Sequence, residues 1–251
     1  MKKLFAANWK MHKTQAEARQ SAEELVRLAG AALPAGREVL VIPPCTALAA
    51  TASGFAGAQN FLVGAQNFYP ATHGAFTGEI SPAMLLDAGA AWALTGHSER
   101  RHVLGESDEF VGQKTAFGLA AGLKIILCVG EKIEERQGKR LVEVLTRQLT
   151  VGLAAVPRDC DPQDLCVAYE PVWAIGTGLV AGPAEILEAH ALVRSLLAGV
   201  FGPAGQQIRI LYGGSVKPDN APEIIALDNV DGVLVGGASL KADDFSRIVL
   251  A

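Results

Sequence analysis

The sequence has few cysteines, no excess of basic residues and no long hydrophobic run, and each shortage excludes a class of protein. The cysteines form no CxxC pair and no zinc-type spacing; they are Cys45, Cys128, Cys160 and Cys166. This favours reduced thiols in a cytoplasmic protein over a disulfide scaffold. The 22 Lys and Arg residues stand against 26 Asp and Glu. Because nucleic-acid binding needs a clustered basic excess, we expect no nucleic-acid partner.

No hydrophobic run approaches the ~20 residues that span a bilayer. The segment Met1–Ala7 imitates the start of a signal peptide, but Asn8 and Lys10 interrupt it at once. We therefore expect no membrane partner and a cytoplasmic location. The sequence also lacks GxSxG, a Walker A motif and a GxGxxG that opens a helix after a strand.

Short hydrophobic runs recur along the 251 residues, half of which are hydrophobic. Most are unbroken rather than alternating, which is typical of parallel strands buried on both faces. We predict eight strands: Leu4–Asn8, Glu38–Ile42, Phe61–Ala65, Trp92–Thr95, Leu123–Val129, Leu165–Glu170, Ile208–Tyr212 and Gly232–Val235.

The segments between these runs are long enough for one crossover helix each. Helical patterns are clearest at Thr14–Leu33, Gly138–Leu153 and Pro183–Gly199, the first with Thr14 as a cap. Eight such units predict the α/β class and a single (β/α)8 barrel over residues 1–251. A doubly wound open sheet is the structural alternative.

Polar residues and glycines follow most of the predicted strands. In a barrel, function lies at these carboxyl ends of the strands. Two glycine-rich turns, Gly213-Gly214-Ser215 and Gly236-Gly237, follow the seventh and eighth strands. Because glycine lets backbone N–H groups approach an anion, these turns predict a phosphate site more strongly together than either does alone.

Two ionisable residues stand out at other strand ends. Glu170 closes a hydrophobic strand, and the following Pro171 favours extended geometry and restricts where the carboxylate points. His97 follows the fourth strand and opens a helix, whose N-terminus should lower its pKa and keep the ring neutral. The strand ends carry no ligand-spaced motif, so we expect no metal and no cofactor.

Eight segments, in order from residue 7 to residue 238, resemble the triosephosphate isomerase family. They are Ala7–Met11, Gly64–Asn67, Gly74–Glu79, Gly96–Arg101, Cys128–Glu131, Tyr169–Gly178, Tyr212–Val216 and Leu234–Ala238. The resemblance implies a TIM barrel that interconverts dihydroxyacetone phosphate and D-glyceraldehyde 3-phosphate through an enediolate, in glycolysis and gluconeogenesis.

The resemblance also assigns roles to individual residues. Glu170 matches the family's base, His97 the group that polarises the carbonyl, and Lys10 the fixed cation beside the developing negative charge. The residues that match substrate contacts are Asn8, Lys10, Gly176, Ser215, Gly236 and Gly237. Glu99 matches a second acidic residue near Lys10, and Ile175 and Leu234 match hydrophobic residues around the base.

Two loops complete the resemblance. Pro171–Ala181 matches a lid that closes over the substrate and excludes water. Residues 66–81 match a dimer loop whose Thr77 reaches the partner's site, with Glu79 and Arg100 as supports. The resemblance therefore implies a homodimer.

Two other functions are weighed against the isomerase. A Schiff-base aldolase would use Lys10 or Lys217, but neither lysine lies inside a hydrophobic strand that would lower its pKa. A non-catalytic barrel that binds phosphate would tolerate Glu170→Gln, whereas an isomerase would not.

Overall fold

The computed structural model describes residues 1–175 and 180–251. Parallel strands form one closed barrel in which each strand pairs with its neighbours in sequence and β1 pairs with β8. They are β1 (Lys3–Asn8), β2 (Arg37–Ile42), β3 (Phe61–Ala65), β4 (Trp92–Thr95), β5 (Lys124–Val129), β6 (Leu165–Tyr169), β7 (Arg209–Tyr212) and β8 (Gly232–Val235). The predicted (β/α)8 TIM barrel is confirmed, and the open sheet is wrong because the β1–β8 pairing closes the ring.

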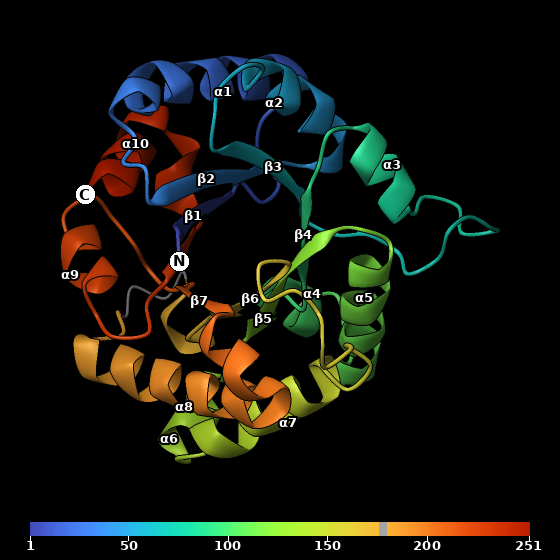
Figure 1. Ribbon diagram of the computed structural model, residues 1–251, viewed down its shortest axis with the longest axis vertical. Helices are drawn as coiled ribbons and strands as arrows, with labels where there is room; N and C mark the ends of the chain where they lie inside the picture. The colour runs from blue at the N-terminus through green and yellow to red at the C-terminus, as the bar shows by residue number, and fades with distance from the viewer. Residues whose placement is uncertain (176–179) are drawn as a thin grey trace.

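Helices surround the strands on all sides (Figure 1). They are α1 (Gln15–Ala29), α2 (Leu48–Gly54), α3 (Pro82–Asp87), α4 (Ser98–His102), α5 (Asp108–Ala120), α6 (Ile133–Gln137), α7 (Leu141–Gly152), α8 (Pro183–Phe201), α9 (Ala221–Ile225) and α10 (Ala242–Leu250). Short 3-10 turns are η1 (Gly30–Ala32), η2 (Cys45–Ala47), η3 (Val172–Ala174), η4 (Gly202–Gln206) and η5 (Gly237–Leu240).

Local signals set the helix ends. The Thr14 side chain caps α1 as predicted, because it accepts a hydrogen bond from the Glu17 N–H while Glu17 binds the Thr14 N–H in return. The helix predicted from Gly138 begins later, at Leu141. Gly138 instead ends α6, and Lys139 follows with a left-handed backbone (φ 54°) that breaks the helix.

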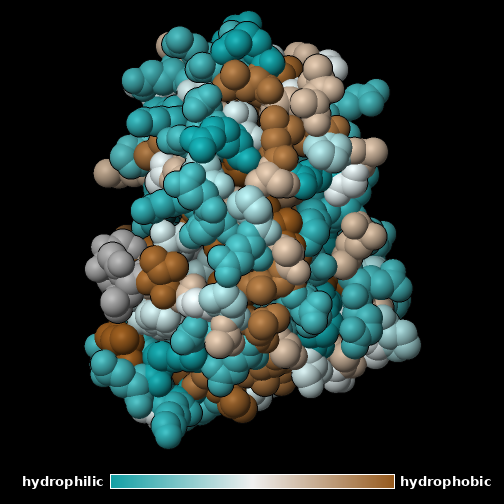
Figure 2. All heavy atoms as spheres, turned by 90° about the vertical axis from the view of Figure 1, so that its left-hand side faces the viewer, coloured by the Kyte–Doolittle hydropathy of each residue, from teal (hydrophilic) through white to brown (hydrophobic). Residues whose placement is uncertain are grey.

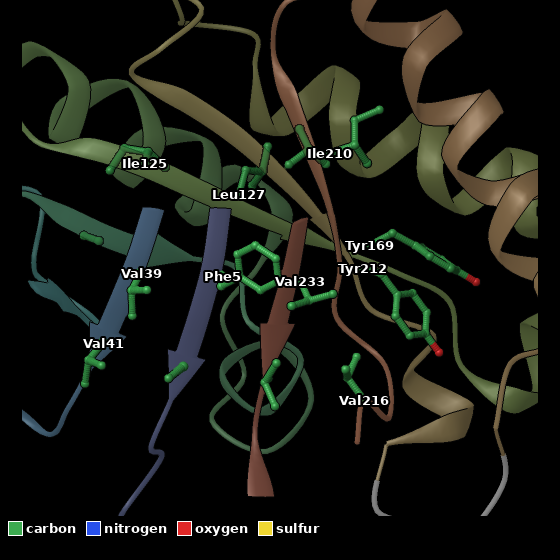
Figure 3. Packing of buried hydrophobic residues seen from close by; sticks show 14 of the residues in the cluster. Phe5, Val39, Val41, Ile125, Leu127, Tyr169, Ile210, Tyr212, Val216 and Val233 are labelled. Atoms are coloured by element: carbon green, nitrogen blue, oxygen red, sulfur yellow. The ribbon is translucent and has the colours of Figure 1, made fainter. Parts of the chain in front are cut away.

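The hydrophobic core has two layers, inside and outside the ring of strands. Phe5 and Ala7 face the helices in the outer layer, whereas Leu4 and Ala6 belong to the interior cluster. Figure 3 shows the outer layer, where Tyr169 and Tyr212 lie side by side on adjacent strands. This alternation follows from the two-residue period of a strand.

The same alternation selects which residues reach the carboxyl end of the barrel interior. In β1, Leu4 and Ala6 face inward, so the next inward position is Asn8. In β6, Cys166 and Ala168 face inward, so the next is Glu170. The two-residue alternation of each strand therefore fills the barrel interior with hydrophobic side chains and then places a polar side chain directly above them.

Hydrophilic residues cover much of the face that carries α9 and α10, with hydrophobic residues interspersed between them (Figure 2). Within residues 1–175 and 180–251, no helix combines the length and hydrophobicity that a membrane crossing needs.

Candidate active site

Asn8 and Lys10 bring polar groups to the end of β1. Lys10 has a left-handed backbone (φ 50°), which is uncommon for a residue with a side chain. Two hydrogen bonds hold it there: the Lys10 N–H donates to Asn8 Oδ1 at 3.0 Å, and Gln66 Nε2 donates to the Lys10 carbonyl at 2.8 Å. The Lys10 ammonium is thereby placed 2.6 Å from the Glu99 carboxylate.

His97 lies at the N-terminus of α4, as predicted. Gly96 before it has φ +68°, and a Cβ there would lie 2.6 Å from the Arg101 guanidinium, so only glycine fits this turn. The His97 ring caps the helix because its Nδ1 accepts a hydrogen bond from the Glu99 N–H at 3.3 Å. Its other nitrogen, Nε2, therefore faces the barrel mouth, with Asn8 Nδ2 at 3.2 Å.

Glu170 is the centre of this arrangement. One carboxylate oxygen lies 3.0 Å from His97 Nε2, and the other accepts a hydrogen bond from the Ser98 N–H at 2.9 Å. The side chain is only 3% exposed. A buried carboxylate that faces a histidine across the mouth of a barrel is equipped to exchange a proton with a small substrate.

Burial disfavours a charge on both Glu170 and His97, but each group stabilises the charged form of the other. Burial alone would raise the pKa of Glu170; the neighbouring His97 outweighs it, and the pKa lies below its ordinary value. Burial alone would lower the pKa of His97, but Glu170 raises it. The expectation of a lowered His97 pKa is wrong because a carboxylate one hydrogen bond away outweighs burial.

The two glycine turns line the same cavity as these groups. A cavity of about 310 Å³ brings together residues from five strand ends, including Asn8, Lys10, His97, Glu170, Ser215, Gly236 and Gly237. Gly237 begins η5, and a Cβ there would meet nothing within 4 Å, so its backbone is open to the cavity. Backbone N–H groups at such a turn suit an anion.

Known proteins are similar to this chain over nearly its whole length. Residues 3–251 match the sequence profile of the family described as triosephosphate isomerase. The chain belongs to that family. It is 65% identical over 251 residues to the triosephosphate isomerase of Nitratidesulfovibrio vulgaris strain Hildenborough, and 62% to that of Oleidesulfovibrio alaskensis, covering 100% of both chains in each case. The crystal structure of triosephosphate isomerase from Bartonella henselae superposes with a TM-score of 0.88 at 39% identity, over 99% of this chain and 98% of that one.

Membership of the triosephosphate isomerase family identifies the chain as an enzyme. Its reaction is the interconversion of dihydroxyacetone phosphate and D-glyceraldehyde 3-phosphate, a step of glycolysis. Both the resemblance of the eight segments and the function drawn from it are confirmed.

Most of the predicted site residues lie in the one cavity. Leu234 and Ile175 line it together with Glu170. Glu99 lies outside the cavity lining and reaches it through Lys10. Gly176 falls among residues 176–179, outside the described residues, and so do Thr177 and Gly178 of the predicted lid.

Two described residues of the predicted lid, Ala174 and Ile175, line the cavity. Pro171 precedes the 3-10 turn η3, and Trp173 in this turn donates a hydrogen bond from Nε1 to Glu131 at 2.8 Å.

Among the residues that the structure describes, no three His, Cys, Asp or Glu side chains gather as a metal ion would require.

Three partners of the site were not singled out from the sequence in the roles they have here. The Ser98 N–H binds the Glu170 carboxylate, Gln66 holds Lys10, and Lys217 lines the cavity beside Ser215. The position of Ser98 in the first helical turn is a signal that could have suggested an N–H donor. No comparable signal marks the other two.

Proposed function

We propose that Glu170 is the base of the triose phosphate isomerisation and that His97 and Lys10 stabilise the charge it creates. The observation that supports this most is the 3.0 Å contact between Glu170 and His97 Nε2 at the cavity that Lys10 also lines. A carboxylate in this place can remove a proton from the carbon beside a carbonyl and return it to the neighbouring carbon.

The charge that develops on the substrate oxygens needs a fixed partner. When Glu170 takes the proton, the electron pair of the broken C–H bond moves into the carbonyl and gives an enediolate. The Lys10 ammonium and the Asn8 amide stabilise this oxygen charge without having to reorient. Because the Glu99 N–H occupies His97 Nδ1, Nε2 is the ring nitrogen that exchanges a proton with the two oxygens.

The phosphate does not react, so its binding energy can hold the substrate in place. We assign this role to the backbone N–H groups of Gly176, Ser215, Gly236 and Gly237. The lid Pro171–Ala181 closes over the bound substrate and excludes water, which strengthens the electrostatic interactions inside. Ile175 and Leu234 keep the base in hydrophobic surroundings. The chemistry needs no metal and no cofactor.

The test is Glu170→Gln in an assay coupled to a dehydrogenase, without added metal. Losing a positioned base should lower kcat by about 10²- to 10⁴-fold. The exposed Glu223 on α9 gives a matched control, since Glu223→Gln makes the same change at a residue outside the cavity lining. Wild-type turnover in the Glu170 variant would reject the base and favour a barrel that only binds phosphate. A substrate adduct trapped by borohydride would instead point to a Schiff-base lysine.

We also propose a cytoplasmic homodimer formed through the loop at residues 66–81. Residues 72–79 of this loop are exposed and project from the barrel (Figure 1), while the Phe76 and Tyr69 rings pack 4.4 Å apart and stiffen it. An exposed, stiffened loop suits a symmetric contact with a second copy. Sedimentation should give twice the chain mass, and Thr77→Arg should shift the protein toward monomer at equal concentration. A wild-type protein with the mass of one chain would contradict the dimer.

A further inference from the structure

The backbone of β5 continues past the point where β4 turns away. The β4–β5 register ends with Thr95 opposite Leu127, because Gly96 redirects the chain into α4. In a parallel sheet, alternate residues direct their N–H and C=O groups to opposite neighbours. The N–H and C=O of Gly130 therefore face the side from which β4 has departed, and both groups need partners because they are buried.

The side chain of Gln148 supplies both partners from the outer helix α7. Its Oε1 accepts a hydrogen bond from the Gly130 N–H at 2.8 Å, and its Nε2 donates to the Gly130 carbonyl at 3.2 Å. Gln148 is 2% exposed. A carboxamide has the same donor and acceptor as a peptide group, so it replaces the missing strand.

Gly130 in turn lies directly against the backbone of Glu170. A Cβ on Gly130 would come within 1.7 Å of the Glu170 carbonyl oxygen. On either side, the Glu170 N–H donates to the Val129 carbonyl at 2.8 Å, and the Val172 N–H donates to the Glu131 carbonyl at 3.1 Å. A displacement of Gly130 is therefore passed on to the backbone of Glu170.

We propose that Gln148 is a positioning residue for Glu170, acting through the two hydrogen bonds to Gly130. This rests on the proposed role of Glu170 as the base. The Glu170 carboxylate is 3.0 Å from His97 Nε2 and 2.9 Å from the Ser98 N–H. Keeping both contacts while the carboxylate reaches a substrate carbon requires a fixed backbone beneath it.

The two hydrogen bonds between Gln148 and Gly130 act as a clamp on the Gly130 backbone. Replacing Gln148 by glutamate makes this clamp depend on the protonation of the new side chain. A neutral carboxyl group keeps one acceptor for the Gly130 N–H and one O–H donor for the Gly130 carbonyl. An ionised carboxylate has acceptors only, and one of them would face the carbonyl oxygen. Because burial favours the neutral form, the clamp should hold at low pH and fail as the pH rises.

The experiment compares kcat and KM of Gln148→Glu with those of the wild type from about pH 6 to about pH 9. We expect kcat near the wild-type value at the low end, falling by about 10- to 100-fold relative to wild type at the high end. KM should change by less than about threefold, since the glycine turns that hold the phosphate are untouched. Gln113→Glu, on the exposed side of α5, is the matched control and should follow the wild type throughout.

Gln148→Met provides a second test that does not depend on protonation. It fills a similar volume without hydrogen-bonding groups, so its kcat should be reduced at every pH, again with KM retained. Circular dichroism at each pH checks that the folded fraction matches the wild type. The proposal would be overturned by variants that fold and keep the wild-type kcat, or by variants in which KM rises while kcat is unchanged. Wild-type turnover in Glu170→Gln would instead reject the base itself, so the two failures are distinguishable.

Discussion

The two ends of the barrel interior are both charged, but they use charge differently. At the amino ends of the strands, the buried Arg209 guanidinium lies 2.7 Å from the Glu38 carboxylate and above the Trp92 ring. At the carboxyl ends, Lys10 and Glu170 line a cavity of about 310 Å³. Arg209 and Glu38 bind each other inside the protein, whereas Lys10 and Glu170 face a cavity that a ligand can enter.

The alternation along the strands explains why both ends are polar. Arg209 and Leu211 lie on the same side of β7, and Glu38, Leu40 and Ile42 on the same side of β2. The inward positions therefore run from an ion pair, through hydrophobic layers, to the site. Burial alone would lower the pKa of Arg209, but Cys166 and Glu38 raise it by more than burial lowers it. The pKa therefore lies above its ordinary value, and the guanidinium stays charged. In such barrels the amino end contributes stability and the carboxyl end contributes function.

The largest effect that would separate the two ends is expected for Glu38→Leu. It leaves Arg209 buried without its carboxylate, which should lower the free energy of unfolding by about 3–5 kcal/mol. Because the change is a barrel length from Glu170, kcat should stay within about twofold of the wild type. Urea unfolding at one fixed protein concentration gives the stability, and the coupled assay gives kcat.

A second variant calibrates this result. Asp164→Asn breaks the Lys124–Asp164 pair, whose side chains are 39% and 43% exposed. Exposed pairs contribute little, so the loss should stay below about 1 kcal/mol. If Glu38→Leu lowered kcat strongly as well as the free energy of unfolding, the assignment of stability to the amino end and of function to the carboxyl end would be wrong.

The barrel could be predicted almost completely from the sequence. Three strands, Phe61–Ala65, Trp92–Thr95 and Gly232–Val235, have the predicted bounds, and the other five differ by one residue at one end. Hydrophobic runs flanked by polar or glycine residues leave little freedom to a buried parallel strand. The helices α6 and α9, at five residues each, show no comparable period, and the sequence does not predict them.

The site was predictable as a set of strand ends but not as a set of contacts. The sequence places His97 at a helix N-terminus, yet it does not show the carboxylate 3.0 Å away that raises its pKa. In the same way, Gln148 is one amide in a helix until the fold brings it to Gly130. Distances between residues on different strands arise only when the sheet closes. These distances set the pKa of His97 and the hydrogen bonds between Gln148 and Gly130.

His190 extends the comparison to a buried histidine outside both ends. Its Nδ1 donates to the Asn229 carbonyl at 2.8 Å, so it faces a neutral acceptor where His97 faces a carboxylate. Burial lowers the pKa of His190 to about 4, from 6.5. The folded protein therefore resists protonation at a pH where the unfolded chain accepts it.

The sign of the His190 effect is opposite to that of a histidine with a raised pKa. Its contribution is fully present above about pH 6.5 and is lost as the pH falls toward about 4, by roughly 3 kcal/mol in total. His190→Gln removes the titration and should flatten this part of the curve. Urea unfolding of both proteins across this range isolates the effect, because carboxylates such as Glu170 titrate in both and cancel in the difference. A difference in unfolding free energy that does not change with pH would show that His190 titrates alike in the folded and unfolded chains.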